Sequence, residues 1–267
     1  MKPFLKWAGG KHKIIDRVLS VLPQADKLVE PFVGSGAVFL GANFKNYLLA
    51  DTNRDLIDLF REVQKSGDNF IDHAVRLFCP ENNSKEAFYR LRDEFNQCLD
   101  IPRRAALFVY LNRHCFNGLC RYNSKGKFNV PFGRYTKPTF PLEEVRNFHT
   151  KSQRAEFVLS DFRSTMQGVS GSAVVYCDPP YAPLSLTSNF SAYTQAGFGV
   201  NDQHDLALEA KALQLRGIPV IISNHDTVFT RAIYSQAVVT GFDVQRFISR
   251  DAGNRAKAAE LLAVFAL

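Results

Sequence analysis

The chain has 267 residues, of which 46% are hydrophobic and 12% aromatic, so it can bury the core of one α/β domain with a subdomain, or of two small domains. No apolar run approaches the about 20 residues that cross a bilayer and no signal peptide follows Met1, so we expect neither a membrane protein nor a secreted one. The net charge of +7 favours a polyanionic partner such as nucleic acid.

The first motif is a glycine turn, Trp7-Ala8-Gly9-Gly10-Lys11, which precedes a predicted helix. Apolar residues spaced three and four apart between Ile14 and Leu22 predict this helix. A turn at a helix N-terminus presents free N–H groups and the positive end of the helix dipole, which favour an anion. A purely structural turn is the alternative.

A strand, a second glycine turn and a helix follow, as at the opening of a doubly wound nucleotide site. Residues 27–30 predict the strand, Gly34 and Gly36 lie in the turn, and residues 37–44 suit the helix. Phe32, at the start of this turn, can pack against an adenine or against the aliphatic chain of a cofactor.

A second short strand, residues 47–50, ends at Asp51. An acidic residue at the tip of this strand is placed to accept hydrogen bonds from ribose hydroxyls. The alternative is that Asp51 caps a helix over residues 53–64. Together with the glycine turn, Asp51 favours a nucleoside cofactor.

The excess positive charge lies in one region. Helical spacing over residues 55–98 indicates scaffold, and residues 103–113 are predicted as another helix. No Asp or Glu occurs between Ile101 and Leu142. That segment carries eight basic residues: Arg103, Arg104, Arg113, Arg121, Lys125, Lys127, Arg134 and Lys137. Because these eight charges exceed the net charge of +7, the rest of the chain is close to neutral.

Turn signals at Asn117-Gly118 and Lys125-Gly126-Lys127 predict an extended hairpin over residues 116–135. Basic, amide and aromatic residues alternate along it. Arg and Lys can neutralise phosphates, Asn can bind the backbone or base edges, and Phe or Tyr can wedge between bases. This pattern predicts contact with nucleic acid; the alternative is an exposed basic hairpin with core aromatics.

Asp178-Pro179-Pro180-Tyr181 follows a buried apolar strand at residues 173–177. Two consecutive prolines bar strand and helix, so the chain leaves the sheet in a stiff turn. A carboxylate and a proline carbonyl can accept both N–H groups of an exocyclic amine, and the tyrosine ring can stack on a planar base. The alternative is a strand-ending turn, because Asp-Pro is a common turn signal.

Other segments around this turn complete the predicted sheet. A strand over residues 156–161 ends in Asp161, which can bind an adenine amine of the cofactor or cap the next helix. After a long loop at residues 182–200, which we expect to be functional, the pattern predicts a helix and three strands: residues 201–215, 218–224, 242–248 and 260–265, with a basic segment at residues 250–257.

His225 and Asp226 follow the predicted strand at residues 218–224. Such a pair suggests catalysis, but we expect Asn224 or Asp226 to cap the next helix.

The cysteines, odd in number and without a C-x-x-C pair, indicate reduced thiols in a cytoplasmic protein: Cys79, Cys98, Cys115, Cys120 and Cys177.

Four motifs occur in one order: Phe-Leu-Lys-Trp-Ala-Gly-Gly-Lys, Glu-Pro-Phe-Val-Gly-Ser-Gly, Asn-Gly-Leu-Cys-Arg-Tyr-Asn and Asp-Pro-Pro-Tyr. In this order, that of the family's α-group, they closely resemble the Dam family of S-adenosylmethionine-dependent DNA adenine N6-methyltransferases, over nearly the whole chain. The resemblance implies an α/β fold with a doubly wound, Rossmann-like methyltransferase sheet. It implies a catalytic domain over residues 1–54 and 152–267, and a mostly helical target-recognition subdomain with a β-hairpin over residues 55–151.

The resemblance also implies roles for individual residues. Cofactor binding is expected for Trp7, Lys11, Phe32, Gly34, Gly36, Asp51 and Asp178, and catalysis for Asp178, Pro179 and Tyr181. Lys6 and Arg121 match residues that recognise the guanines of GATC, and Leu119 and Pro131 match contacts to the inner base pair. DNA backbone anchors are expected at Arg113, Asn123, Asn129 and Arg134, with a further DNA contact at Asn117.

Two positions depart from the family pattern. Phe116 stands where a Tyr is usually inserted into the base stack; it keeps the wedge and loses a hydroxyl. Cys115 stands where a Gly is common and can alter the hinge before the hairpin.

The family's reaction is an in-line methyl transfer from S-adenosylmethionine to a flipped adenine of duplex DNA, without a metal, by an enzyme that we expect to be a cytoplasmic, nucleoid-associated monomer. The gene's origin is expected to be bacterial, or a phage or plasmid. Two other functions stay open at this point: an RNA or protein amino-group methyltransferase, and a DNA-binding module that has lost catalysis.

Overall fold

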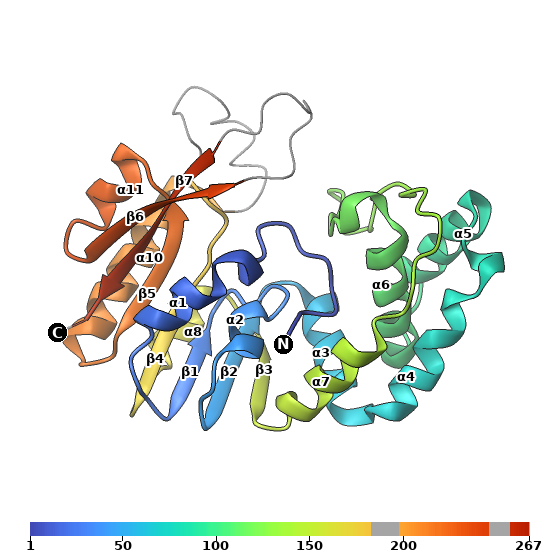
Figure 1. Cartoon of the computed structure of the whole chain (residues 1–267), viewed down its shortest axis with the longest axis horizontal. Helices are drawn as coiled ribbons and strands as arrows, with labels where there is room; N and C mark the ends of the chain where they lie inside the picture. The colour runs from blue at the N-terminus through green and yellow to red at the C-terminus, as the bar shows by residue number, and fades with distance from the viewer. Residues whose placement is uncertain (183–197, 246–256, 267) are drawn as a thin grey trace. The chain divides into compact units, whose positions relative to one another are not determined.

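The computed structural model describes residues 1–182, 198–245 and 257–266 (Figure 1). The chain forms two compact units by its internal contacts. Unit 1 comprises Met1–Leu19, Val33–Asn43 and Asp51–Leu159, and unit 2 comprises Ser20–Phe32, Phe44–Ala50 and Ser160–Leu267. The predicted division into a catalytic domain and a recognition subdomain is a division by function, which these contacts do not test, so it stays a prediction.

Unit 2 is built on a mixed sheet. Its strands are β1 (Lys27–Glu30), β2 (Asn46–Asp51, whose last residue belongs to unit 1), β4 (Ala173–Cys177), β5 (Val220–His225), β6 (Val238–Gln245) and β7 (Lys257–Phe265). They lie in the order β2-β1-β4-β5-β7-β6. Strands β2, β1, β4 and β5 are parallel, whereas β7 runs antiparallel to both β5 and β6. The predicted α/β class is therefore confirmed.

The order of the strands reverses at β1, whose neighbours are β2 and β4. In open α/β sheets, ligands bind outside the carboxyl ends of the strands at such a reversal. The residues that follow β1 and β4 therefore start at the edge where a site is expected.

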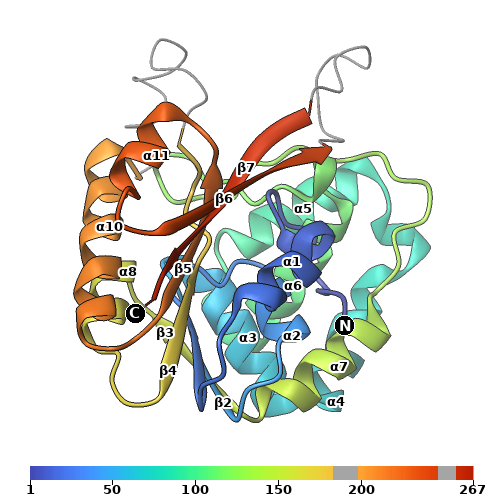
Figure 2. The same cartoon turned by 60° about the vertical axis from the view of Figure 1, so that its left-hand side comes forward.

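Apolar side chains explain why the helices of unit 2 cover this sheet. Helix α10 (Val200–Leu215) lies along β5 and β7, with α8 (Phe162–Gln167) and α11 (Val228–Ile233) beside it (Figures 1 and 2). Its buried Leu206, Ala210 and Leu213 recur every three or four residues, as one helix face requires. They share a core with Val175 and Ile222 of the central strands.

Unit 1 is mostly helical. It contains α2 (Ala37–Gly41), α3 (Arg54–Ser66), α4 (Asp68–Val75), α5 (Lys85–Phe95), α6 (Ile101–His114), α7 (Leu142–Ser152), β3 (Ala155–Leu159) and the short 3-10 turns η1 (Lys11–Ile14), η2 (Arg76–Phe78), η3 (Pro80–Asn82) and η4 (Phe116–Gly118). Helix α1 (Ile15–Val21) runs from unit 1 into unit 2. Helix α6 packs against α3, α4 and α5, and is buried from Ala105 to Asn112 (Figure 1).

Most predicted elements are confirmed, and the strands at residues 27–30 and 173–177 have the predicted bounds. The predicted helix over residues 37–44 ends earlier, at Gly41. The predicted loop at residues 182–200 and basic segment at residues 250–257 fall largely outside the described residues.

Residues 116–135 fold back on themselves, as the predicted hairpin requires, but the prediction of two continuously paired strands is wrong. Two isolated antiparallel bridges, Cys115 with Phe132 and Tyr122 with Phe128, replace them. Between them, η4 interrupts the extended chain because Asn117 has a φ of 55°. We call residues 116–135 the recognition loop, after the role that the sequence predicts for them.

The predicted cap of α11 is also wrong. Thr227, not Asn224 or Asp226, is the N-cap, because its side chain directly precedes the helix and accepts from Thr230 N. Asp226 instead pairs with Arg231 at 2.5 and 2.7 Å. In contrast, Asp161 does cap α8, accepting from Ser164 N at 2.8 Å.

Candidate active site and nucleic-acid interface

The first glycine turn in unit 1 is closed by hydrogen bonds of its own. Gly10 N donates to Trp7 O at 3.3 Å, and the buried Lys11 amine donates to Gly9 O at 2.8 Å. Because η1 begins at Lys11, the turn ends where a helical segment starts, as the sequence predicts.

The second glycine turn brings three predicted cofactor residues together. Asp51 accepts from Gly34 N through Oδ2 at 3.1 Å and from Asn53 N through Oδ1 at 2.9 Å. Gly34 has a φ of +49°, and a Cβ there would lie 3.0 Å from Trp7 Nε1, so a side chain at this position would be strained. Gly36 is the left-handed N-cap of α2.

Asp51 has capacity left for a ligand. Each carboxylate oxygen has two lone pairs and takes one of these backbone N–H groups. Burial raises the pKa of Asp51, and the N–H groups of Asn53, Gly34 and Thr52 oppose that rise. The cap of α3 is Asn53, which accepts from Leu56 N at 3.2 Å, so the alternative role for Asp51 is not found.

Phe32 belongs to an aromatic cluster of unit 2. Its ring stacks on Phe162, with centroids 5.4 Å apart, and meets Phe198 edge-on at 5.6 Å. Phe32 therefore starts the turn after β1 with its ring supported by neighbours from outside that turn.

The Asp178-Pro179-Pro180-Tyr181 turn leaves the carboxyl end of β4 in unit 2, where neighbouring strands hold its side chains. Ser223 of β5 donates to Asp178 Oδ1 at 3.1 Å. The Tyr181 hydroxyl donates to Glu260 Oε2 of β7 at 3.1 Å, and its ring meets His225 edge-on at 4.7 Å. Burial, and next the Asp178 charge, raise the pKa of Tyr181, which keeps this hydroxyl a donor.

Buried amides that sequence reasoning missed hold the backbone of the same turn. Gln203, on α10, donates to Pro180 O at 2.8 Å, and Asn224, on β5, accepts from Ala182 N at 3.0 Å. The two amides are joined at 3.0 Å, from Asn224 Nδ2 to Gln203 Oε1. Asn224 Nδ2 also donates to the Tyr234 hydroxyl at 3.1 Å.

The sequence did carry a signal for these amides. Gln203 lies three residues before Leu206 on the buried face of α10, and Asn224 interrupts a buried apolar strand. Buried polar side chains require partners, so such positions mark hydrogen-bonding networks. His225 and Asp226 do not pair with each other: His225 Nδ1 donates to Ala182 O at 2.6 Å, and Asp226 binds Arg231.

One buried amide, Asn112 of α6, holds the predicted DNA contact Lys6 together with the end of η4 in unit 1. Lys6 N donates to Asn112 Oδ1 at 2.8 Å, and Asn112 Nδ2 donates to Lys6 O at 2.8 Å and to Gly118 O at 3.1 Å. The Lys6 amine lies 3.9 Å from the centroid of the Tyr135 ring. Burial, and next Arg113, lower the pKa of Lys6.

Phe116 and its neighbours form an exposed tip on η4. Phe116 is 49% exposed, although its N–H is fixed to Pro131 O at 2.8 Å. Asn117 is exposed in a left-handed conformation, and Leu119 is half-buried. A large aromatic ring on a fixed backbone in contact with solvent is the form that a wedge requires.

Cys115, just before this tip, has φ −76° and ψ 163°, which any residue adopts. The hinge therefore needs no glycine here. Its thiol is buried against Leu119 O at 3.3 Å, and burial raises the pKa of Cys115 to about 12.

The remaining predicted contacts lie along the recognition loop. Arg121 donates to Asn129 Oδ1 at 2.8 Å, and Asn123 Oδ1 accepts from the backbone of Lys125 and Lys127 at 3.0 Å each. Pro131 and Arg134 are exposed, and Arg113 is half-buried.

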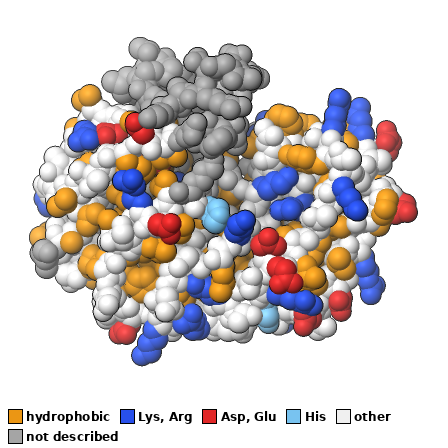
Figure 3. All heavy atoms as spheres, viewed as in Figure 1, with side chains coloured by type: hydrophobic (Ala, Val, Ile, Leu, Met, Phe, Trp, Pro, Cys, Tyr) orange, Lys and Arg blue, Asp and Glu red, His pale blue; other side chains and the backbone are white. Residues whose placement is uncertain are grey.

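No carboxylate lies within ion-pairing distance of the cations of the recognition loop, over the residues that the structure describes. Figure 3 shows Lys and Arg side chains, in blue, among hydrophobic ones over the part of unit 1 that holds α5 and α6. A group of cations without counter-charges suits phosphate contacts.

The chain is similar to known proteins over nearly its whole length. The family model of the D12 class N6 adenine-specific DNA methyltransferases matches residues 7–248. The chain is 51% identical to the DNA adenine methylase of Serratia marcescens, covering 99% of this chain and 98% of that protein. It is 50% identical to that of Escherichia coli strain K12, covering 99% and 95%. The crystal structure of TrmN from Thermus thermophilus is similar at 11% identity and a TM-score of 0.42, over 96% of this chain and 48% of that one.

The matched range includes both glycine turns, the recognition loop and the Asp-Pro-Pro-Tyr turn. The chain therefore belongs to the D12 class of N6 adenine-specific DNA methyltransferases and is a DNA adenine methylase of the Dam family.

Proposed function

We propose that this enzyme transfers a methyl group from S-adenosylmethionine to N6 of adenine in GATC sites of duplex DNA, after flipping the adenine out of the helix. The single observation that carries the proposal is the Asp178-Pro179-Pro180-Tyr181 turn, whose side chains and backbone are fixed from α10, β5 and β7. A fixed turn is needed because this transfer depends on positioning and electrostatics.

The cofactor-binding residues have suitable chemistry. Asp51 would accept the ribose hydroxyls with its remaining lone pairs, beside Trp7 and the backbone of Gly34. Lys11, Phe32, Gly36 and Asp178 complete the proposed set. S-adenosylmethionine supplies the methyl group on a sulfonium, an electrophile that requires no metal.

The amine of the flipped adenine would donate its two N–H groups to the Asp178 carboxylate and to the Pro179 carbonyl. Pro180 O already accepts from Gln203, whereas no donor within the described residues reaches Pro179 O. These hydrogen bonds would hold the amine nitrogen toward a tetrahedral arrangement, with its lone pair directed at the methyl group. Tyr181 would stack on the base, and Asp178 would stabilise the positive charge that develops on nitrogen.

Adenine inside a duplex is inaccessible to this turn, and flipping it costs a few kcal/mol. The exposed Phe116 would fill the gap that the base leaves. Lys6 and Arg121 would recognise guanines, with Leu119 and Pro131 on the inner base pair. The DNA backbone would be bound by Arg113, Asn123, Asn129 and Arg134, with Asn117 as a further contact.

Residues 1–54 and 152–267 would form the catalytic domain and residues 55–151 the target-recognition subdomain. The enzyme would act in the cytoplasm, at the nucleoid, as a monomer. In the part of the chain that the structure describes, none of the helices is long and apolar enough to cross a membrane.

The test is methyl transfer from labelled S-adenosylmethionine to two duplexes that differ only in GATC against a scrambled site. We expect label on the GATC duplex alone, located as N6-methyladenine. The variant Asp178→Ala should bind this duplex and transfer no label. Equal labelling of both duplexes would refute the GATC assignment, and wild-type turnover by Asp178→Ala would refute the role of the turn.

A further inference from the structure

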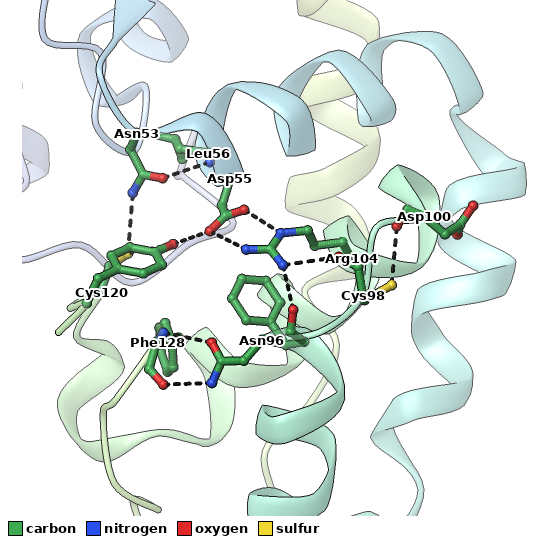
Figure 4. A network of polar contacts seen from close by, with 11 residues as sticks. Asn53, Asp55, Leu56, Asn96, Cys98, Asp100, Arg104, Cys120 and Phe128 are labelled. Carbon is green, nitrogen blue, oxygen red and sulfur yellow. Dashed lines mark hydrogen bonds and ion pairs between the residues drawn. The ribbon is translucent and has the colours of Figure 1, made fainter. Parts of the chain in front are cut away.

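Asp55, the second residue of α3, is bound by two partners from elsewhere in unit 1 (Figure 4). Arg104 of α6 donates to Oδ1 at 2.6 Å and to Oδ2 at 3.1 Å. The Tyr122 hydroxyl, from the recognition loop, donates to Oδ2 at 2.6 Å. The Asp55 carboxylate that accepts from Tyr122 is thus fixed by a bidentate contact with Arg104.

Arg104 is itself fixed. It donates to Phe95 O at 2.5 Å and to Cys98 O at 3.2 Å, and its guanidinium lies 4.1 Å from the centroid of the Phe95 ring. The anchor for Tyr122 is therefore part of the helical scaffold, because α3, α5 and α6 all contribute to it.

The recognition loop meets this scaffold at two further points. Asn53 Nδ2 donates to Cys120 Sγ at 3.5 Å. Asn96, which caps the end of α5, accepts from Phe128 N at 2.8 Å and donates to Phe128 O at 3.1 Å (Figure 4). Tyr122 and Phe128 are bridge partners whose rings meet edge-on at 5.9 Å.

The anchored residues alternate with the exposed ones. Cys120 and Tyr122 are tied to α3, and Arg121, which lies between them, is exposed. Burial, and then the nearby Cys120 and Asp55, raise the pKa of Tyr122 far above its usual value, so its hydroxyl remains a donor over the working pH range. The backbone of Arg121 is thus held on both sides.

We propose that Asp55 and Tyr122 are positioning residues for DNA recognition, which fix the recognition loop so that Arg121 meets its base pair in register. This inference rests on the proposed function, in which Arg121 recognises a guanine. A bidentate contact to guanine O6 and N7 needs the guanidinium placed within a fraction of an ångström. A loosened loop would still bind phosphates but would discriminate base pairs poorly.

The test uses a double-mutant cycle. Methyl transfer kcat/KM is measured on a GATC duplex and on duplexes with one base pair of the site changed, for wild type, Tyr122→Phe, Arg121→Ala and the double variant. The variant Tyr122→Phe, which loses one oxygen, should lower discrimination by about 3- to 10-fold, the range expected for one lost hydrogen bond. The loss should occur at the base pair that Arg121→Ala affects, and Tyr122→Phe should add nothing to it in the Arg121→Ala background.

Two further variants serve as comparisons. Tyr89→Phe is the matched control, because Tyr89 is a half-buried tyrosine of α5 whose hydroxyl makes no hydrogen bond within the described residues. It should keep wild-type discrimination. Asp55→Asn keeps an oxygen for Tyr122 but loses the charge that faces Arg104, so its discrimination should stay closer to wild type than that of Tyr122→Phe.

Wild-type discrimination by Tyr122→Phe, or an equal fall of kcat/KM on every duplex, would overturn the positioning role. A further loss of discrimination in the double variant would overturn its action through Arg121. If the wild type itself does not prefer GATC, the proposed function fails, and the positioning role fails with it. If the wild type prefers GATC and Arg121→Ala alone changes that preference, only the positioning role fails.

Discussion

Asn112 is the residue whose replacement should lower both the stability of the fold and the proposed recognition of DNA. It lies on α6 and is 1% exposed. It binds both peptide groups of Lys6, at 2.8 Å each, and the carbonyl of Gly118, at 3.1 Å. The change Asn112→Ala therefore releases the segment before the first glycine turn and the end of η4 together.

The cost follows from the hydrogen bonds that are lost. Each typically contributes about 0.5–1.5 kcal/mol net, and unpaired buried groups cost more. Three lost bonds, with an N–H and two carbonyls left behind, should lower the free energy of unfolding by about 3 kcal/mol. A surface substitution usually changes it by less than about 0.5 kcal/mol.

Urea unfolding followed by circular dichroism measures this loss, with the exposed Asn43→Ala as the control. Under conditions where Asn112→Ala is folded, its discrimination at the base pair that we propose Lys6 recognises should also fall, because Lys6 loses its backbone partners. A loss of stability below about 1 kcal/mol would contradict the reasoning, since a single net hydrogen bond accounts for that much.

Three further predictions concern other buried groups. Burial lowers the pKa of His114 to about 4, whereas the ring in the unfolded chain binds a proton below about pH 6.5. The free energy of unfolding should therefore decrease as the pH falls from 6.5 to 4, by at most about 2 kcal/mol between pH 7 and 5. Urea unfolding of His114→Gln should show that this pH dependence is lost. Because burial raises the pKa of Asp51, cofactor affinity measured by calorimetry should weaken as the pH falls toward that pKa, and Asp51→Asn should bind weakly at every pH. Gln203→Leu removes the donor to Pro180 O and should slow single-turnover methyl transfer by about tenfold with DNA affinity unchanged; unchanged turnover would contradict its role.

The sheet could be predicted well because its strands are short, buried and bounded by turn residues. Residues 27–30 are a short run with a central Leu-Val pair before a proline, residues 173–177 are an apolar run before Asp-Pro, and both bounds are correct. Since parallel strands bring their carboxyl ends to one edge, the residues after β1 and β4 could be proposed as a site from sequence alone. That Asp51 binds Gly34 N follows the same logic.

Prediction failed where a side chain decides between local conformations. The recognition loop alternates as a hairpin does, yet the left-handed Asn117 interrupts the ladder. The cap of α11 went to Thr227 because the residue directly before the helix has the required extended backbone, whereas Asp226 is one position too early. Nothing in the spacing indicates that Tyr122 lies against Asp55, 67 positions away in the chain.

Buried amides hold both of the segments to which a function is assigned. Asn112 holds Lys6 and Gly118 in unit 1, and Gln203 with Asn224 holds the turn after β4 in unit 2. An amide carries a donor and an acceptor, so it can satisfy a peptide group as a neighbouring strand would. A buried charge would cost far more to desolvate, and its field would act on the phosphates and on the developing charge that the proposed reaction brings to these segments. Neutral amides therefore hold the backbone of these segments, whereas carboxylates, Asp55 and Glu260, hold the tyrosine hydroxyls of the recognition loop and of the turn.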